Sequence, residues 1–466
     1  MKTILILTLL IVMYGNALSQ NITNTLGANG LFTIKDGTTT YLSLGLTNGY
    51  LSLNRSITLL YTTNSGTGVI YKGTDRFIHN YQSPASFGEN TFVGINSGNF
   101  TMSGSAGESS YNTGIGMYSL FTNSTGYNNT ALGHASLTYN NTGYQNTAIG
   151  TSSLALNSSG NNNTAVGFRS LLANTTGSLN TAIGSFALNL NTIGLQNTAI
   201  GHFSLFSNIT GGNNVAIGHQ SLYSNGSGIE NTAVGSSALY SNTTGVKNTV
   251  VGLNSLPSNT TGSWNSAYGL ESMLMNVSGS SNTAFGTYSG INITTGNNNI
   301  ALGYFVELPS GTSSNQVKIG NSSISYAGIQ VAWTITSDRK WKENIVTSSL
   351  GLRFINRLHP VSYTRINDES KKTEYGLIAQ EVEEVLKEED AENSAMITVT
   401  DEGNYELRYN DLIAPMVKAI QELKAENDVL KAKVESLKTI EVRLEKLEKI
   451  FKQNSNSLNV NLAEEK

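Results

Sequence analysis

Ser337 and Lys342 are the residues of this 466-residue chain whose types and spacing could together do covalent chemistry. A serine hydroxyl is a poor nucleophile until a neighbouring group takes its proton. A lysine removed from water can be neutral enough to be that neighbour. Serine is abundant here and lysine is common, so the pair alone indicates little. Its meaning depends on the sequence around it.

Five short motifs occur in a fixed order around and after this pair. They are Ser337-Asp338 followed by Lys342 and Asn344-Ile345, Leu358-His-Pro-Val-Ser-Tyr363, Tyr375-Gly-Leu-Ile-Ala-Gln-Glu-Val-Glu383, Tyr409-x-Asp-Leu-Ile413 and Lys418-Ala-Ile420. This order resembles the C-terminal intramolecular chaperone domain of phage endosialidase tailspikes. That family of self-cleaving serine peptidases also occurs in the myelin regulatory factor. The resemblance covers about residues 337–437.

The resemblance implies a Ser/Lys dyad that acts within a homotrimer. Ser337 matches the family nucleophile, Lys342 matches its base, and the scissile bond is Thr336–Ser337. Cleavage would release the C-terminal part once the fibre has trimerised. The remaining β-rich rod would then owe its persistence to a slow unfolding rate rather than to equilibrium.

Three neighbours of the dyad complete this hypothesis. Asp338 and Asn344 receive supporting roles, in which they orient the dyad or hold the turn. Lys340 is the competing base, but it sits at a different offset from Ser337. Lys342 is therefore the preferred base.

A strict seventeen-residue repeat precedes this region, with twelve starts from Asn112 to Asn299. The fifth position is always glycine, the ninth is leucine or methionine in the first ten copies, and the twelfth is asparagine in those same copies. Such a repeat is one structural layer copied along an axis. The glycines favour corners, the central Thr-Ala-Ile/Val favours a strand, and stacked asparagines can form a hydrogen-bonded ladder.

These features predict a β-solenoid or β-roll over residues 112–303, in a chain that is mainly β. Alanine and isoleucine or valine, side by side, should point to opposite faces of the strand. Because each layer has few apolar residues, three rods packed together are expected rather than one alone. The pattern resembles the head repeats of trimeric adhesins, although its period is longer. The alternatives are a flexible low-complexity tract and a threonine-bearing face that binds ice or polysaccharide.

The N-terminus has the features of a secretory signal peptide over residues 1–19. Lys2 precedes an apolar run from Ile4 to Met13, and small residues Ala17 and Ser19 lie before the expected cut. Short alternating runs then predict a β-rich head or cap over residues 20–111. The sequence has no segment long and apolar enough for a transmembrane anchor. We therefore expect an exported protein, secreted or held at the cell surface.

The C-terminal third becomes charged and changes pattern. Connector strands are expected over residues 304–336, one of them at Ile329–Trp333, and a small α+β chaperone domain over 337–412. Within that domain an amphipathic helix is expected from Glu374 to about Lys387, followed by a hairpin. A heptad pattern then predicts a coiled coil over 413–453 and a polar tail over 454–466. The core rules for Ile or Val at a, Leu at d and Asn427 at a favour two strands, whereas the family resemblance implies three.

Composition excludes several other functions. The net charge is −4, which gives no case for nucleic-acid binding. The chain has no cysteine, so no disulfide framework exists, and no cofactor or metal is expected. Only seven charged residues lie between Asn90 and Gly320, which speaks against a glycan-degrading enzyme that needs a carboxylate pair. An uncut adhesin, in which the C-terminal domain only trimerises and folds the fibre, is the main alternative; a host-surface or glycan ligand stays open.

Overall fold

A computed structural model describes residues 31–36, 39–45, 51–53, 57–331, 333–366 and 370–461. The expected signal peptide lies outside these residues. The chain divides into two units, residues 1–69 and 70–466. In the first unit, strands β1 (Leu31–Asp36), β2 (Thr39–Gly45) and β3 (Leu51–Leu53) form an antiparallel sheet in that order. This agrees with the β-rich pattern of the sequence.

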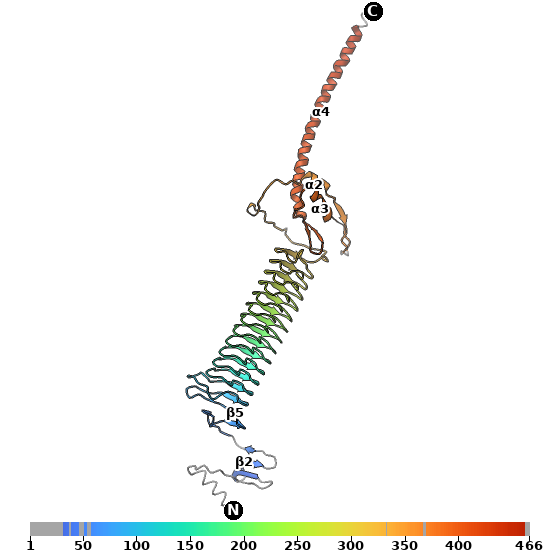
Figure 1. The fold of residues 1–466 in the computed structure, drawn as a ribbon. Helices are drawn as coiled ribbons and strands as arrows, with labels where there is room; N and C mark the ends of the chain where they lie inside the picture. The colour runs from blue at the N-terminus through green and yellow to red at the C-terminus, as the bar shows by residue number, and fades with distance from the viewer. Residues whose placement is uncertain are drawn as a thin grey trace, which may run out of the picture. The chain divides into compact units, whose positions relative to one another are not determined.

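The second unit contains a sixteen-stranded sheet that builds the solenoid. Its strands are β4 (Ile70–Lys72), β5 (Asp75–His79), β6 (Thr91–Val93), β7 (Thr113–Ile115), β8 (Thr130–Leu132), β9 (Thr147–Ile149), β10 (Thr164–Val166), β11 (Thr181–Ile183), β12 (Thr198–Ile200), β13 (Val215–Ile217), β14 (Thr232–Val234), β15 (Thr249–Val251), β16 (Ser266–Tyr268), β17 (Thr283–Phe285), β18 (Ile300–Leu302) and β19 (Val317–Ile319). From β6 to β19 all neighbours are parallel, and from β7 onward partner residues are seventeen apart. Figure 1 shows these strands stacked layer on layer. The predicted solenoid is confirmed, and its sheet extends beyond residues 112–303 at both ends.

Each layer has a buried and an exposed side, as the strand alternation predicts. In the layer that begins at Asn146, Ala148 and Leu154 are fully buried, whereas Ile149 is 37% exposed. The corresponding residues of successive layers pair in register. The outward side chains therefore form a continuous apolar row, here called the outer row: Ile115, Leu132, Ile149, Val166, Ile183, Ile200, Ile217, Val234, Val251, Tyr268, Phe285, Leu302 and Ile319.

The fifth-position glycines are required by the backbone. Gly201 has a φ of +135°, and a Cβ built on it would lie 2.5 Å from the carbonyl oxygen of Gly218 in the next layer. The other corner glycines of the repeat have a similar φ. A side chain there would be strained and would also push two layers apart.

Two asparagine ladders run through the interior. At the twelfth position, Asn191 Nδ2 donates to Asn174 Oδ1 at 2.9 Å and to the carbonyl of Gly194 at 3.1 Å. Asn208 Nδ2 in turn donates to Asn191 Oδ1 at 2.8 Å. The first-position asparagines bond similarly along most of the solenoid. The predicted ladder is thus confirmed, in two copies. The twelfth-position ladder ends at Asn276, whose buried Oδ1 accepts no hydrogen bond in the described structure.

Replacing Asn191 by Ala should destabilise the solenoid by about 2–4 kcal/mol, because the substitution removes three hydrogen bonds, two that Asn191 donates and one that it accepts from Asn208. Guanidinium unfolding followed by circular dichroism would measure the loss as a faster unfolding rate. The exposed Thr176, replaced by Ala, is the control and should unfold at the parental rate. If both variants unfolded at the same rate, the asparagine ladder would not stabilise the solenoid as proposed.

The C-terminal part of the second unit is a small α+β arrangement followed by a long helix. Its elements are η1 (Arg339–Trp341), α2 (Leu352–Arg357), β20 (Val361–Tyr363), β21 (Glu374–Gly376), α3 (Ala379–Glu388), β22 (Ile397–Val399), β23 (Tyr405–Leu407), η2 (Tyr409–Leu412) and α4 (Ile413–Asn461). Strands β20 and β21 pair antiparallel, as do β22 and β23. The predicted hairpin is therefore confirmed. None of the helices in the described part of the chain is long and apolar enough to cross a membrane.

Two expectations about this part were wrong. Residues 374–376 form strand β21 rather than the first turn of a helix, because they pair with β20; the helix begins at Ala379. No strand forms at residues 329–331 or at Trp333, because none of the described strands pairs with this segment. Helix α2, which supplies the buried Phe354, was not foreseen.

The small domain has its own apolar core. Phe354 of α2 and Val382 and Leu386 of α3 are buried together with Leu350, Met396 and Leu412. Helix α4 packs on α2, and residues 423–455 of α4 are all exposed. The heptad a and d residues of α4 are all exposed: Ile413, Met416, Ile420, Leu423, Leu430, Val434 and Leu437. The coiled coil therefore stays a prediction.

Candidate active site

A single short turn separates Ser337 from Lys342. Asp338 is the N-cap of η1, where its carboxylate accepts a hydrogen bond from the backbone N–H of Lys340 at 3.1 Å. This is the usual role of aspartate before a helical turn. Lys342 is the C-cap, and its backbone N–H donates to the carbonyl of Arg339 at 3.0 Å. The turn thus brings two side chains five residues apart to the same place.

The structure places the side chains of Ser337 and Lys342 in direct contact. Lys342 Nζ donates to Ser337 Oγ at 2.7 Å. Lys340, the competing base, instead forms an ion pair with Asp338 Oδ2 at 3.2 Å. The two lysines therefore have different partners, and Lys342 is the one within proton-transfer distance of the hydroxyl.

The supporting residues take the positions of turn formers. Asp338 caps η1 and forms the ion pair with Lys340. Asn344 has a φ of +52°, a left-handed conformation that asparagine tolerates better than most residues. Both roles concern the path of the chain, and neither side chain has a recorded contact with the Ser337 hydroxyl.

The contact lies in water in the single chain. Ser337 and Lys342 are both exposed. A protonated amine cannot accept a proton, so only the neutral form of a lysine can act as the base. Removal from water is the change that favours the neutral amine. The geometry of a nucleophile–base pair is present, whereas the environment that would activate the base is not.

Large apolar side chains flank the pair and are also exposed. Trp333, Ile335, Trp341, Ile345 and Val346 each have more than half of their surface in contact with solvent. Soluble monomers rarely leave so many large apolar groups uncovered in one place. This segment has the composition of a buried surface.

Two contacts fix the end of this segment to α4. Lys418 Nζ donates to the carbonyl of Ser348, and the backbone N–H of Leu352 donates to Glu422 Oε2 at 2.6 Å. The hydrogen bond from Leu352 is the main reason that the pKa of the Glu422 carboxyl lies below its usual range. Glu422 thus supplies the side-chain cap that the first residue of α2 needs. No pattern in the sequence indicated these two contacts.

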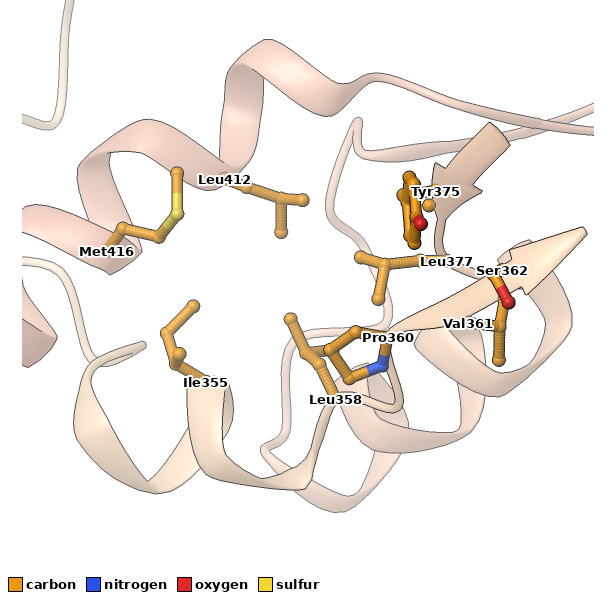
Figure 2. Close-up of a pocket in the computed structure, with 10 residues that line it drawn as sticks. Ile355, Leu358, Pro360, Val361, Ser362, Tyr375, Leu377, Leu412 and Met416 are labelled. Carbon is orange, nitrogen blue, oxygen red and sulfur yellow. The ribbon is translucent and has the colours of Figure 1, made fainter. Parts of the chain in front are cut away.

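An apolar hollow of about 560 Å³ lies beside the start of α4. Figure 2 shows its walls, which come from α2 and the residues after it, from β20–β21 and from the start of α4. The lining residues are Ile355, Leu358, Pro360, Val361, Ser362, Tyr375, Gly376, Leu377, Leu412 and Met416. Within the described residues no three His, Asp or Glu side chains gather closely enough to hold a metal ion.

Comparison with known proteins identifies this region. Residues 337–390 match the family model described as chaperone of endosialidase. The match begins at Ser337, the residue predicted to be the nucleophile. The chain thus has a β-solenoid followed by a segment that matches this family model, and the resemblance inferred from its motifs is confirmed over residues 337–390. No curated protein and no solved structure matches the chain.

Proposed function

We propose that this chain is an exported trimeric fibre whose C-terminal domain assists folding and then cuts the Thr336–Ser337 bond. Ser337 is the nucleophile and Lys342 the base. The observation that carries the proposal is the 2.7 Å contact between Lys342 Nζ and Ser337 Oγ at the start of the chaperone-of-endosialidase match. Export rests on the signal-like residues 1–19.

The proposed reaction uses the bond immediately before the nucleophile. Neutral Lys342 takes the hydroxyl proton of Ser337 while Oγ attacks the carbonyl carbon of Thr336. The C–N bond breaks, the proton passes to the amine nitrogen of Ser337, and an ester joins Thr336 to Oγ. Water then hydrolyses the ester. The products are a Thr336 carboxylate and a new chain that begins with the free amine of Ser337.

Three exposed apolar surfaces support assembly from several copies. They are the outer row of the solenoid, the a and d positions of α4, and residues 333–346 around the dyad. Each would be costly to leave in water over such a length. The family implies three copies, and we choose three although Asn427 and the β-branched a positions favour two.

Coupling a cut to assembly makes physical sense for this fold. Parallel layers that pair across seventeen residues require many non-local contacts, which fold slowly. A helical domain can hold three chains together during that time. Once the layers have formed, the cut releases the domain and leaves a rod that unfolds too slowly to need it.

The test is a gel of the exported chain beside its Ser337→Ala form. We expect fragments of about 320 and 130 residues from the parent and an uncut chain from Ser337→Ala. Ser323→Ala, an exposed serine before the scissile bond, is the matched control and should be cut normally. Sedimentation of both samples reports assembly. A parent that sediments as a trimer yet stays full length would overturn the cleavage and leave the uncut adhesin as the better reading.

A further inference from the structure

The hollow described above is left open by the described residues and has a composition suited to a large apolar side chain. Its walls carry aliphatic residues such as Leu358, Val361 and Leu377, and its volume exceeds that of one tryptophan side chain. Tyr375 stands at its rim and is 83% exposed (Figure 2). A buried aromatic anchor in such a pocket is the commonest source of binding energy at interfaces.

A segment of this same chain carries the side chain that such a pocket would accept. Trp341 is 73% exposed and lies directly before Lys342. Ile345 and Val346 follow and are exposed as well. From Lys342 to Val346 the backbone is neither helix nor strand, so these side chains are not committed to a core of their own.

The position of the hollow along α4 points to a neighbouring copy as the source. Leu412 and Met416 line the hollow, and Met416 is also the first d position of the heptad pattern. Ser348 is bonded to Lys418, within one helical turn of Met416. In a parallel bundle equal residue numbers lie at equal heights, so a neighbour's residues before Ser348 arrive beside this hollow.

We propose that the hollow of each copy receives Trp341 of a neighbouring copy, and that this docking removes the adjacent Lys342 from water. The inference rests on the proposed function, because it assumes that the chains assemble through α4. It makes Trp341 a positioning residue: the indole does not touch the scissile bond, but its burial closes the site around the base. Desolvation favours the neutral amine that takes the serine proton. A lone chain, with Trp341 in water, stays uncut.

Cysteine cross-linking tests the docking directly, because the chain contains no cysteine. We would introduce Glu343→Cys and Tyr375→Cys into the full Ser337→Ala chain, which keeps Trp341 and stays uncut. Docking between copies predicts covalent dimers and trimers after mild oxidation, seen on a non-reducing gel. The control pair Glu343→Cys and Glu392→Cys, whose second residue does not line the hollow, should give several-fold less product. Monomers alone from assembled protein, or equal yields from the two pairs, would overturn the proposal.

The effect on cleavage separates positioning from general packing. Trp341→Ala should slow cleavage at least tenfold in chains that still sediment as trimers, and Trp341→Phe should restore most of the rate. Trp264→Ala, an exposed tryptophan of the solenoid outside the three assembly surfaces, is the control and should remain within about threefold of the parent. If the Trp341→Ala chain does not assemble, the cross-linking experiment still tests the docking, because its chains keep Trp341. If the Trp341→Ala chain assembles and is cut at the parental rate, the docking is refuted and the Ser/Lys cleavage is not. An uncut assembled parent would refute the cleavage instead.

Discussion

Replacing Lys342 by Met should reduce self-cleavage at least about a thousandfold, whereas replacing Lys340 by Met should leave the rate within about threefold. Lys342 Nζ lies 2.7 Å from Ser337 Oγ, whereas Lys340 is paired with Asp338. General-base catalysis is worth about 10²–10⁴ in rate, and the serine has no other base recorded in contact with it. The rate would be followed as the appearance of the released fragment over time by gel and mass spectrometry.

Lys342→Arg provides the sharper control. Arginine preserves the positive charge but does not give up its proton in proteins, so it cannot act as the base. We expect an assembled and uncut chain. If the arginine form were cut at the parental rate, Lys342 would be serving only as a charge and the proposed mechanism would fail. Cleavage lost in Lys340→Met but kept in Lys342→Met would assign the base to the other lysine.

Gly201→Ala should destabilise the solenoid by about 3–5 kcal/mol, enough to prevent its accumulation in folded form. The new Cβ would lie 2.5 Å from the carbonyl oxygen of Gly218, and an L residue would be forced to a φ of +135°. Overpacking and backbone strain each cost about 1–3 kcal/mol. The yield of soluble, protease-resistant rod and the midpoint of its thermal unfolding would report the loss.

The matched control for this prediction is Gly226→Ala in the same solenoid. Gly226 has no positive φ, and a Cβ there would meet its nearest neighbour, the carbonyl oxygen of Thr243, at 3.6 Å. This is ordinary contact, so the change should lie within about 0.5 kcal/mol of the parent. Comparable damage from both substitutions would mean that glycine matters here for some reason other than the corner geometry.

Much of the solenoid could be predicted because the same residue type recurs at the same position of each repeat and so indicates the structural role of that position. The invariant glycine, the buried Leu154 and the laddered Asn157 all occupy the places that the spacing indicated. The backbone of the leucine could not be foreseen. Leu154 has a φ of +50°, and the leucines at this position share that conformation in nine layers. Propensity rules place leucine elsewhere; stacking of identical layers overrides them.

The candidate site was predictable in its residues and not in its surroundings. The offset between Ser337 and Lys342 follows from one capped turn, which local chemistry specifies. The strand expected at 329–333 did not form, since apolar alternation shows only that a segment becomes buried and does not say against what. Ile329, Val331 and Trp333 are all exposed in the single chain. No described segment of the chain covers these side chains, and none covers α4 beyond Glu422.

The in-register stacking has a consequence for the reach of the molecule. Each layer presents the next layer with the same strand pairing and the same asparagine side-chain hydrogen bond. The gain or loss of one seventeen-residue layer within the solenoid therefore leaves the types of contact between layers unchanged. The rod would lengthen or shorten by about 4.8 Å per unit while both ends keep their structure. The length of the solenoid is thus a quantity that can change in whole steps without a new fold.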